Sequence, residues 1–167
     1  RSKEKIDQKF QVFSQPGMRQ EHMEKREFLT PLLLDGFGGE LPEEEHRMLM
    51  KEAISCGLLD GEEPEALNYA VMVTRILDKD GKNCTTRGSV KAIDSILKKY
   101  TKYCSVYLQG RVVSLLLATP RGFDKYLHIL VDDICQSVER IMGMDSVIGV
   151  SRVVEKLERC HECYLEA

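Results

Sequence analysis

The sequence holds one cysteine pair at metal-ligand spacing, in the run Cys160-His161-Glu162-Cys163. Thiols three residues apart share one face of a helix, so the pair could form half of a zinc site. A structural zinc takes four ligands, usually from a second such pair, and the sequence has no other CxxC or HxxxH run. On a helix, His161 also points away from both thiols. We therefore expect Cys160 and Cys163 to pack in a core without a metal ion.

The loop Asp78-Lys79-Asp80-Gly81-Lys82-Asn83 offers oxygen ligands of the kind that calcium binds. A calcium-binding EF-hand needs glycine at the sixth position of its loop and a bidentate glutamate at the twelfth. Here Gly81 is the fourth residue and Ser89 is the twelfth. The sequence therefore predicts a plain turn at this loop.

The run Gly36-Phe37-Gly38-Gly39-Glu40 is rich in glycine, as phosphate-binding loops are. It follows a predicted helix rather than a strand, and it lacks the Lys and Ser/Thr that such a loop requires. The run is more typical of a helix end.

No other arrangement in the sequence is typical of an enzyme. No serine or cysteine lies in a Gly-x-Ser-x-Gly nucleophile elbow. The four histidines are scattered over predicted helices without evident partners, and they are His22, His46, His128 and His161. The sequence predicts no catalytic, cofactor-binding or metal-binding residue, no cofactor and no enzymatic activity.

The spacing of apolar residues predicts helices in the first part of the chain. These helices cover residues 3–13 with Ile6, Phe10 and Phe13 on one stripe, then residues 21–34 after an interruption at Pro16-Gly17, then residues 42–55 before Gly57. Pro42 suits a first helical turn, and the acidic residues 43–45 complement the helix dipole. Residues 1–56 are therefore predicted to be a helical segment.

The second part of the chain alternates strands and helices. The predicted elements are a strand at 68–77, a helix at 88–103, strands at 104–108 and 111–118 joined by Gln109-Gly110, a helix from Thr119-Pro120 to Gly143, a strand at 146–150, and a last helix with Val153, Leu157, Cys160 and Tyr164 in line. This β-α-β-β-α-β-α order predicts an α+β fold with a ferredoxin-like antiparallel sheet and two helices on one face. Leu115-Leu116-Leu117 is apolar on both faces, so the second face needs a cover. The candidates are residues 21–55 and the last helix.

Length and charge limit the classes of protein that the sequence can belong to. Its 167 residues suffice for one domain, or for one domain with a helical attachment. The net charge of −3 argues against direct nucleic-acid binding by the chain as a whole. Residues 40–65 carry nine acidic and two basic side chains, whereas residues 79–102 carry seven basic and two acidic ones. Both segments are most simply explained as solvated surfaces, although their opposite charges could also steer contact with another domain.

The sequence predicts a cytoplasmic protein that does not enter a membrane. No apolar run approaches the 20 or so residues of a membrane span, and no signal peptide is recognisable at the N-terminus. The six cysteines are then expected to be reduced thiols, and they are Cys56, Cys84, Cys104, Cys135, Cys160 and Cys163. The first residue is not methionine, and both ends are predicted to lie within helices, so we expect a piece of a longer polypeptide.

Two stretches resemble a known family. The strand Ser146-Val147-Ile148-Gly149-Val150-Ser151, followed by a helix that ends in Tyr164-Leu165-Glu166-Ala167, resembles the closing stretch of a GGDEF-like domain. Upstream, Phe28-Leu29 with Leu32-Leu33-Leu34 and a glycine resembles the FL..LL.G motif of AraC-type response regulators. The resemblance implies a bacterial two-component regulator with a receiver domain, a helical connector (residues 1–56), a degenerate GGDEF-like middle domain (residues 57–167) and two helix-turn-helix units.

The sequence departs from the catalytic members of that family. An active diguanylate cyclase carries Gly-Gly-Asp/Glu-Glu-Phe at the hairpin between its second and third strands, and its carboxylates hold metal. The hairpin here is Leu108-Gln109-Gly110-Arg111-Val112-Val113, which contains no carboxylate. The first strand, where a cyclase has a metal-binding Asp, has Thr74-Arg75-Ile76. Because Mg²⁺ needs anionic oxygen ligands, we expect no cyclase activity.

The resemblance implies a non-catalytic regulatory domain that couples a receiver domain to a DNA-binding domain elsewhere in the polypeptide. Two alternatives stay open, a module that senses a small molecule and a nucleotide-binding domain that has lost catalysis. The apolar stripe of residues 6–13 needs a partner, so the N-terminal helices are expected either to form a homodimer or to fold back on the domain.

Overall fold

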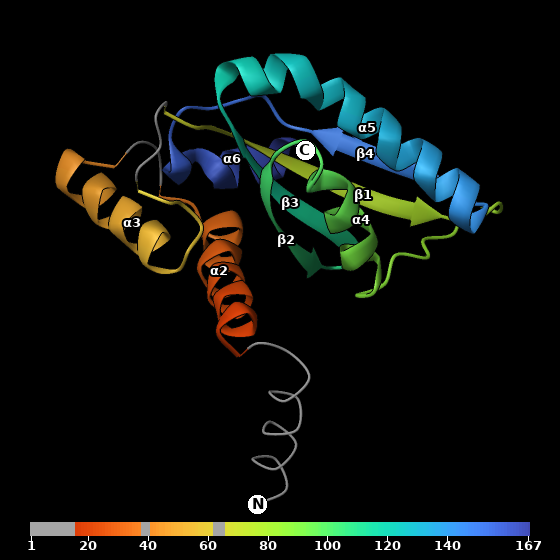
Figure 1. Ribbon diagram of the computed structural model, residues 1–167, viewed down its shortest axis with the longest axis horizontal. Coiled ribbons are helices and arrows are strands. Elements are labelled where there is room, and N and C mark those ends of the chain that lie inside the picture. The colour runs from red at the N-terminus through yellow and green to blue at the C-terminus, as the bar shows by residue number, and fades with distance from the viewer. Residues whose placement is uncertain (1–15, 38–40, 62–65) are drawn as a thin grey trace, which may run out of the picture.

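The computed structural model describes residues 16–37, 41–61 and 66–167, with side chains from residue 24 onwards. In this part of the chain the fold is α+β, with one four-stranded antiparallel sheet (Figure 1). The strands are β1 (Asn68–Leu77), β2 (Lys102–Leu108), β3 (Arg111–Ala118) and β4 (Asp145–Val150). The helices are α2 (Pro16–Leu34), α3 (Glu43–Ser55), α4 (Ser89–Leu97), α5 (Pro120–Met142) and α6 (Cys160–Glu166), with a 3₁₀ turn η1 (Leu157–Arg159) before α6. The helix expected at residues 3–13 lies outside the described residues.

The sheet has the strand order β2-β3-β1-β4. The central strand β1 pairs with β3, where Val71 lies opposite Leu115, and with β4, where Thr74 lies opposite Ile148. The predicted hairpin joins β2 to β3, and its two turn residues Gln109 and Gly110 have φ values of 51° and 77°. Two-residue hairpin turns with positive φ at both positions match the right-handed twist of the strands.

Both faces of the sheet are covered, so the fold has three layers (Figure 1). On one face α4 and α5 pack on β1 and β3 through a cluster that includes Met72, Ile93, Leu116 and Ile134. Each of these side chains is at most 1% exposed. Burial of one such side chain contributes about 1.5–3 kcal/mol to stability.

The second face is covered by the two segments that the sequence proposes for it. Leu29 and Leu33 of α2, Ala53 of α3, and Leu157 and Cys160 in η1 and α6 pack on the sheet in one buried cluster. The expectation that Leu115–Leu117 is buried from both sides is confirmed, because these three side chains are at most 1% exposed. The division of the chain at residues 56 and 57 stays a prediction.

The predicted ends of the long helix are confirmed. Thr119 Oγ1 accepts a hydrogen bond from the backbone N–H of Gly122 at 3.1 Å, and Pro120 is the first helical residue. Gly143 ends α5 in the left-handed region at a φ of 65°. These are the usual N-cap, first-turn proline and C-terminal glycine of a helix.

Three predicted helix bounds are wrong. The helix expected to reach Tyr103 ends at Leu97, because Lys102 and Tyr103 pair with β3. The last helix does not include Val153, since Val154 forms a bridge with Tyr69 and holds this segment extended. The helix expected from residue 21 already includes residues 16–20. None of the described helices is long and apolar enough to cross a membrane.

Candidate functional site

The β2-β3 hairpin is built from neutral and basic groups. Arg111 Nη2 donates to Tyr164 Oη at 2.9 Å, and its guanidinium lies 5.6 Å from the centre of the Tyr164 ring. Asn83 Nδ2 donates to the carbonyl of Gly110 at 2.8 Å. The loop at 78–83 therefore braces the hairpin, a contact that the sequence analysis missed.

The carboxylate of Asp78 closes the turn of the 78–83 loop. Asp78 Oδ1 accepts hydrogen bonds from the backbone N–H groups of Asp80 and Lys82 at 2.9 and 2.8 Å. This contact confirms the predicted turn, since an aspartate that binds its own following amides closes a tight loop. Among the described residues, no group of three His, Cys, Asp or Glu side chains is placed to hold a metal ion.

The six cysteines are free thiols in the structure. Cys160 and Cys163 lie in the core at 0% and 1% exposure, so the predicted packing of this pair is confirmed. Burial raises the pKa of both thiols. A buried thiol with a raised pKa is a poor nucleophile at neutral pH.

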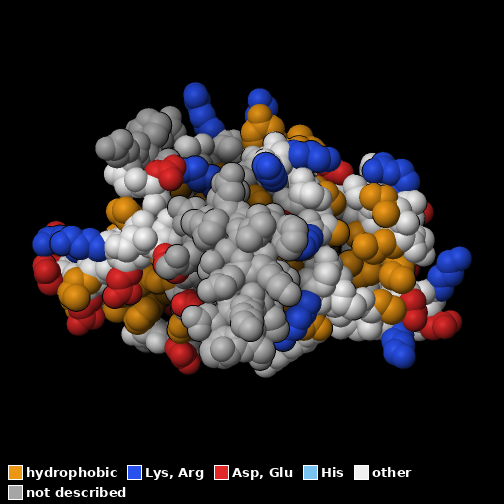
Figure 2. All heavy atoms as spheres, turned by 60° about the horizontal axis from the view of Figure 1, so that its bottom comes forward, with side chains coloured by type: hydrophobic (Ala, Val, Ile, Leu, Met, Phe, Trp, Pro, Cys, Tyr) orange, Lys and Arg blue, Asp and Glu red, His pale blue; other side chains and the backbone are white. Residues whose placement is uncertain are grey.

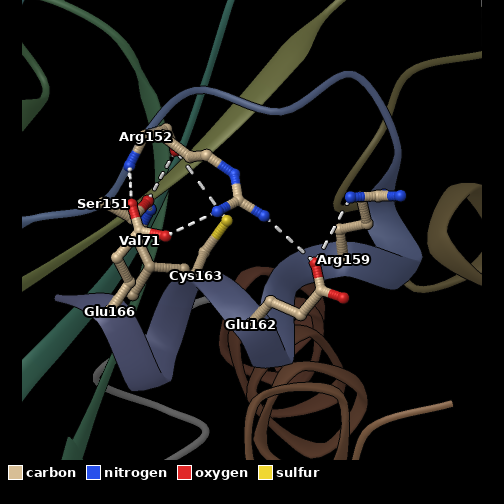
Figure 3. Close-up of polar contacts among 7 residues, drawn as sticks. All are labelled: Val71, Ser151, Arg152, Arg159, Glu162, Cys163 and Glu166. Atoms are coloured by element: carbon tan, nitrogen blue, oxygen red, sulfur yellow. Dashed lines mark hydrogen bonds and ion pairs between the residues drawn. The ribbon is translucent and has the colours of Figure 1, made fainter. Parts of the chain in front are cut away.

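Helix α6 is attached to the sheet by a polar network (Figure 3). Ser151 Oγ accepts from the backbone N–H of Val71 at 3.0 Å and donates to the carbonyl of Arg152 at 2.8 Å. Figure 3 shows the Arg152 guanidinium reaching toward two carboxylates of α6, and its Nη1 lies 2.9 Å from Glu166 Oε2 while its Nη2 lies 3.3 Å from Glu162 Oε2. The segment after β4 thus ties α6 to β1.

The same short helix contacts the end of α2. His161 Nδ1 donates to the carbonyl oxygen of Leu33 at 2.6 Å. The last carbonyls of a helix have no partner within the helix, so the imidazole satisfies one of them. A Cβ at Gly36 would lie 2.7 Å from the His161 ring, so only glycine at this position leaves space for the ring.

A second histidine links α3 to the turn before α6. His46 Nδ1 lies 2.8 Å from Glu158 Oε1, and the carboxylate is fully buried while the imidazole is about one third exposed. The backbone N–H of Leu41 donates to Glu158 Oε2 at 3.4 Å. A buried carboxylate needs such partners, because removal of a charge from water is costly.

The expectation that the histidines lack partners is therefore wrong for His46 and His161. Their partners lie 112 and 128 residues away in the chain, so no local spacing could reveal them. His128 is exposed on α5, and the side chain of His22 lies outside the described residues. The only signal in the sequence was that both histidines occur on helices proposed to cover the second face.

Taken together, these contacts join α2, α3, η1 and α6 into one candidate functional site, a coupling interface defined by Leu33, His46, Glu158 and His161. It contains two histidines and a buried carboxylate, which are bound to each other or to backbone groups. His46 also lines a cavity of 370 Å³, together with Met50, Tyr69 and Glu155.

No family model, curated protein or solved structure matches this chain.

Proposed function

We propose that this chain is a non-catalytic, signal-transmitting domain of a two-component transcriptional regulator, with residues 57–167 forming a degenerate GGDEF-like domain of ferredoxin-like topology. The support for the topology is the strand order β2-β3-β1-β4 with α4 and α5 on one face. In this proposal residues 1–56 connect a receiver domain to the sheet. A helix-turn-helix domain elsewhere in the same cytoplasmic polypeptide receives the signal.

One observation carries the proposal. Helices α2 and α6 lie far apart in the sequence, yet they pack together on the same face of the sheet and share the hydrogen bond from His161 to Leu33 (Figure 1). A displacement of α2 would therefore act on α6 without crossing the sheet. Coupling between two sites needs such a contiguous contact, and the element that moves needs two arrangements.

The hairpin supports the non-catalytic part of the proposal. In the proposed resemblance, Arg111 stands where a cyclase hairpin carries its metal-binding carboxylates, and its guanidinium binds Tyr164. A fixed positive charge repels Mg²⁺. Incubation of the chain with GTP and Mg²⁺ is expected to give no cyclic dinucleotide, and metal-dependent turnover above a protein-free control would contradict the proposal.

Hydrogen exchange tests the coupling directly. In a His161→Ala variant we expect faster amide exchange in the last turn of α2, because the Leu33 carbonyl loses its partner and α6 loosens. The matched control is His128→Ala, which removes an exposed imidazole from α5. If the amide exchange rates in α2 of the His161 variant equal those of the wild type, the proposed coupling is wrong.

The regulatory role is tested in the complete polypeptide that contains this chain. Transcription from a target promoter is measured with and without phosphorylation of the receiver domain, in the His161→Ala and His128→Ala variants. We expect the first variant to lose most of the response to phosphorylation and the second to retain it. An equal response in both variants would argue against transmission through this interface.

A further inference from the structure

A cavity of 360 Å³ opens between α2, the residues after α3, the end of α4 and the beginning of β2. Its polar and charged lining comprises Lys25, Arg26, Asp60, Asp94, Lys98, Thr101, Lys102, Tyr103 and Ser105. The volume falls within the range of about 300–1,000 Å³ that is usual for small-molecule sites. The cavity belongs neither to the hairpin nor to the coupling interface.

The lining carries more cations than anions. Four cationic side chains and two carboxylates surround the cavity, and Asp60 Oδ2 lies 2.8 Å from Lys102 Nζ. Figure 2 shows the same bias over a wider area, with acidic side chains gathered mainly at the end of the molecule formed by α3 and basic ones spread over the rest of this face. An anion would lower the repulsion among the cations.

Two of the cations reach the walls of the cavity from α2. The hydrogen bond from Lys102 is the main reason for the lowered pKa of Asp60, and the charge of Lys25 lowers it further. Burial raises the pKa of Cys104 to about 12, and the charges of Arg26 and Lys25 oppose that shift. Lys25, Asp60 and Cys104 line the same cavity.

Arg26 is held in a position that leaves part of its guanidinium for a ligand. Its Nε donates to the carbonyl of Ser105 at 3.1 Å, which fixes the side chain against the outer strand β2. In the part of the chain that the structure describes, Nη1 and Nη2 of Arg26, and the ammonium groups of Lys25 and Lys98, form no ion pair. A guanidinium fixed through Nε presents two parallel N–H donors, the geometry that matches a phosphate or carboxylate.

We propose that this cavity binds a small phosphomonoester, held by Arg26 through its terminal nitrogens and by Lys25 and Lys98 through their ammonium groups. The phosphate dianion matches the excess positive charge of the lining. Asp94 and Thr101 line the rest of the cavity. This binding site is argued from the cavity and its lining and does not depend on the proposed function.

The consequence for regulation rests on the proposed function. Lys25 and Arg26 belong to α2, whereas Lys98 follows α4 and Ser105 belongs to β2. A ligand that bridges these elements would fix α2 on the sheet and so bias the helix that carries Leu33. The phosphorylated metabolite would then act as a second input to the same coupling interface.

Binding is tested by NMR titration of the full chain with glycerol 3-phosphate. We expect shifts in the amides of residues 57–58 and 101–105, with a dissociation constant in the millimolar range or below. In a Lys25→Gln, Lys98→Gln double variant the dissociation constant should rise about tenfold or more, because two charge-assisted contacts are lost. The matched control is the Lys79→Gln, Lys82→Gln double variant, which removes the same charge from the exposed 78–83 loop.

Three results would overturn the proposal. They are no shifts around the cavity at millimolar ligand, equal weakening in the control variant, and tighter binding of citrate than of the phosphomonoester. The first would remove the site, the second would reduce it to general charge attraction, and the third would assign it to carboxylates. None of them bears on the exchange experiment with His161, so failure of this site and failure of the coupling proposal can be told apart.

Discussion

The buried pair of His46 and Glu158 allows a sharp test of what holds α3 to the rest of the fold. The Glu158 side chain is fully buried and the His46 side chain is 32% exposed. A buried polar group that loses its hydrogen-bond partner costs about 1–3 kcal/mol, and more if the group is charged. Because water can reach the site once the exposed imidazole is removed, we expect His46→Ala to lower the free energy of unfolding by about 2 kcal/mol, which is less than the full cost of an isolated buried charge.

The companion variant separates the charge from the shape. Glu158→Gln keeps the volume and one acceptor, so it should cost about 1 kcal/mol, the usual net value of one hydrogen bond. The double variant should be more stable than the sum of the two single changes predicts, since a neutral amide suffers less than a carboxylate from the absence of His46. We expect a coupling free energy of about 1 kcal/mol from this cycle.

Urea unfolding followed by far-ultraviolet circular dichroism at pH 7, with a reductant present, measures all four free energies. The control is His128→Ala, an exposed change that should stay within about 0.5 kcal/mol of the wild type. If His46→Ala also stays within that margin, the hydrogen bond to Glu158 does not support the fold, and the interpretation of α3 as a firmly attached helix is wrong.

Three further predictions concern a buried thiol, a glycine in β4 and the N-terminal segment. Burial raises the pKa of Cys104 from 9.0 to about 12, so the unfolded chain loses this proton first, and the thiol should lower stability by about 1.4 kcal/mol per pH unit between pH 9 and about pH 12. In urea titrations over this range Cys104→Ala should show a shallower fall, and equal slopes would refute this. A Cβ at Gly149 would lie 2.8 Å from the carbonyl oxygen of Ala167, so Gly149→Ala should lower the free energy of unfolding in urea by about 1–3 kcal/mol. The control Gly88→Ala, where no atom lies nearer than 3.5 Å to the added Cβ, should lower it by less than 1 kcal/mol, and equal costs would contradict the contact. Light scattering over a concentration series should show a dimer for the full chain and a monomer for a chain without residues 1–20; two monomers would rule out the N-terminal dimer.

The sequence predicted the strands well because their signals are local. β1 has the predicted bounds, and the turn at Gln109-Gly110 is placed by a glycine with positive φ. The helix after Gly88 was extended too far, because its periodic apolar pattern continues into Tyr100 and Tyr103. Only the pairing of Lys102 with Leu117, a contact across the sheet, ends the helical region earlier. Local periodicity cannot include that competition.

The candidate sites were harder to predict for a related reason. The partners of His46, His161 and Arg26 are more than 75 residues away in the chain, and two of the three contacts use backbone carbonyls or helix ends. Any residue type supplies a carbonyl, so the sequence of the acceptor carries no signal. The cavity beside α2 depends in the same way on how three separate elements pack.

The end of α2 shows how a helix can be both well packed and adjustable. Pro31 lies inside its last turn and has no N–H, so one hydrogen bond of the helix is absent there. Leu29 and Leu33 are nevertheless fully buried, and the carbonyl of Leu33 is bound by His161. The last turn thus lacks one of its own hydrogen bonds and is supported in addition by contacts with the sheet and with α6. In the proposed function this is the property that matters, because a helix end stabilised from outside changes its position when its partner moves.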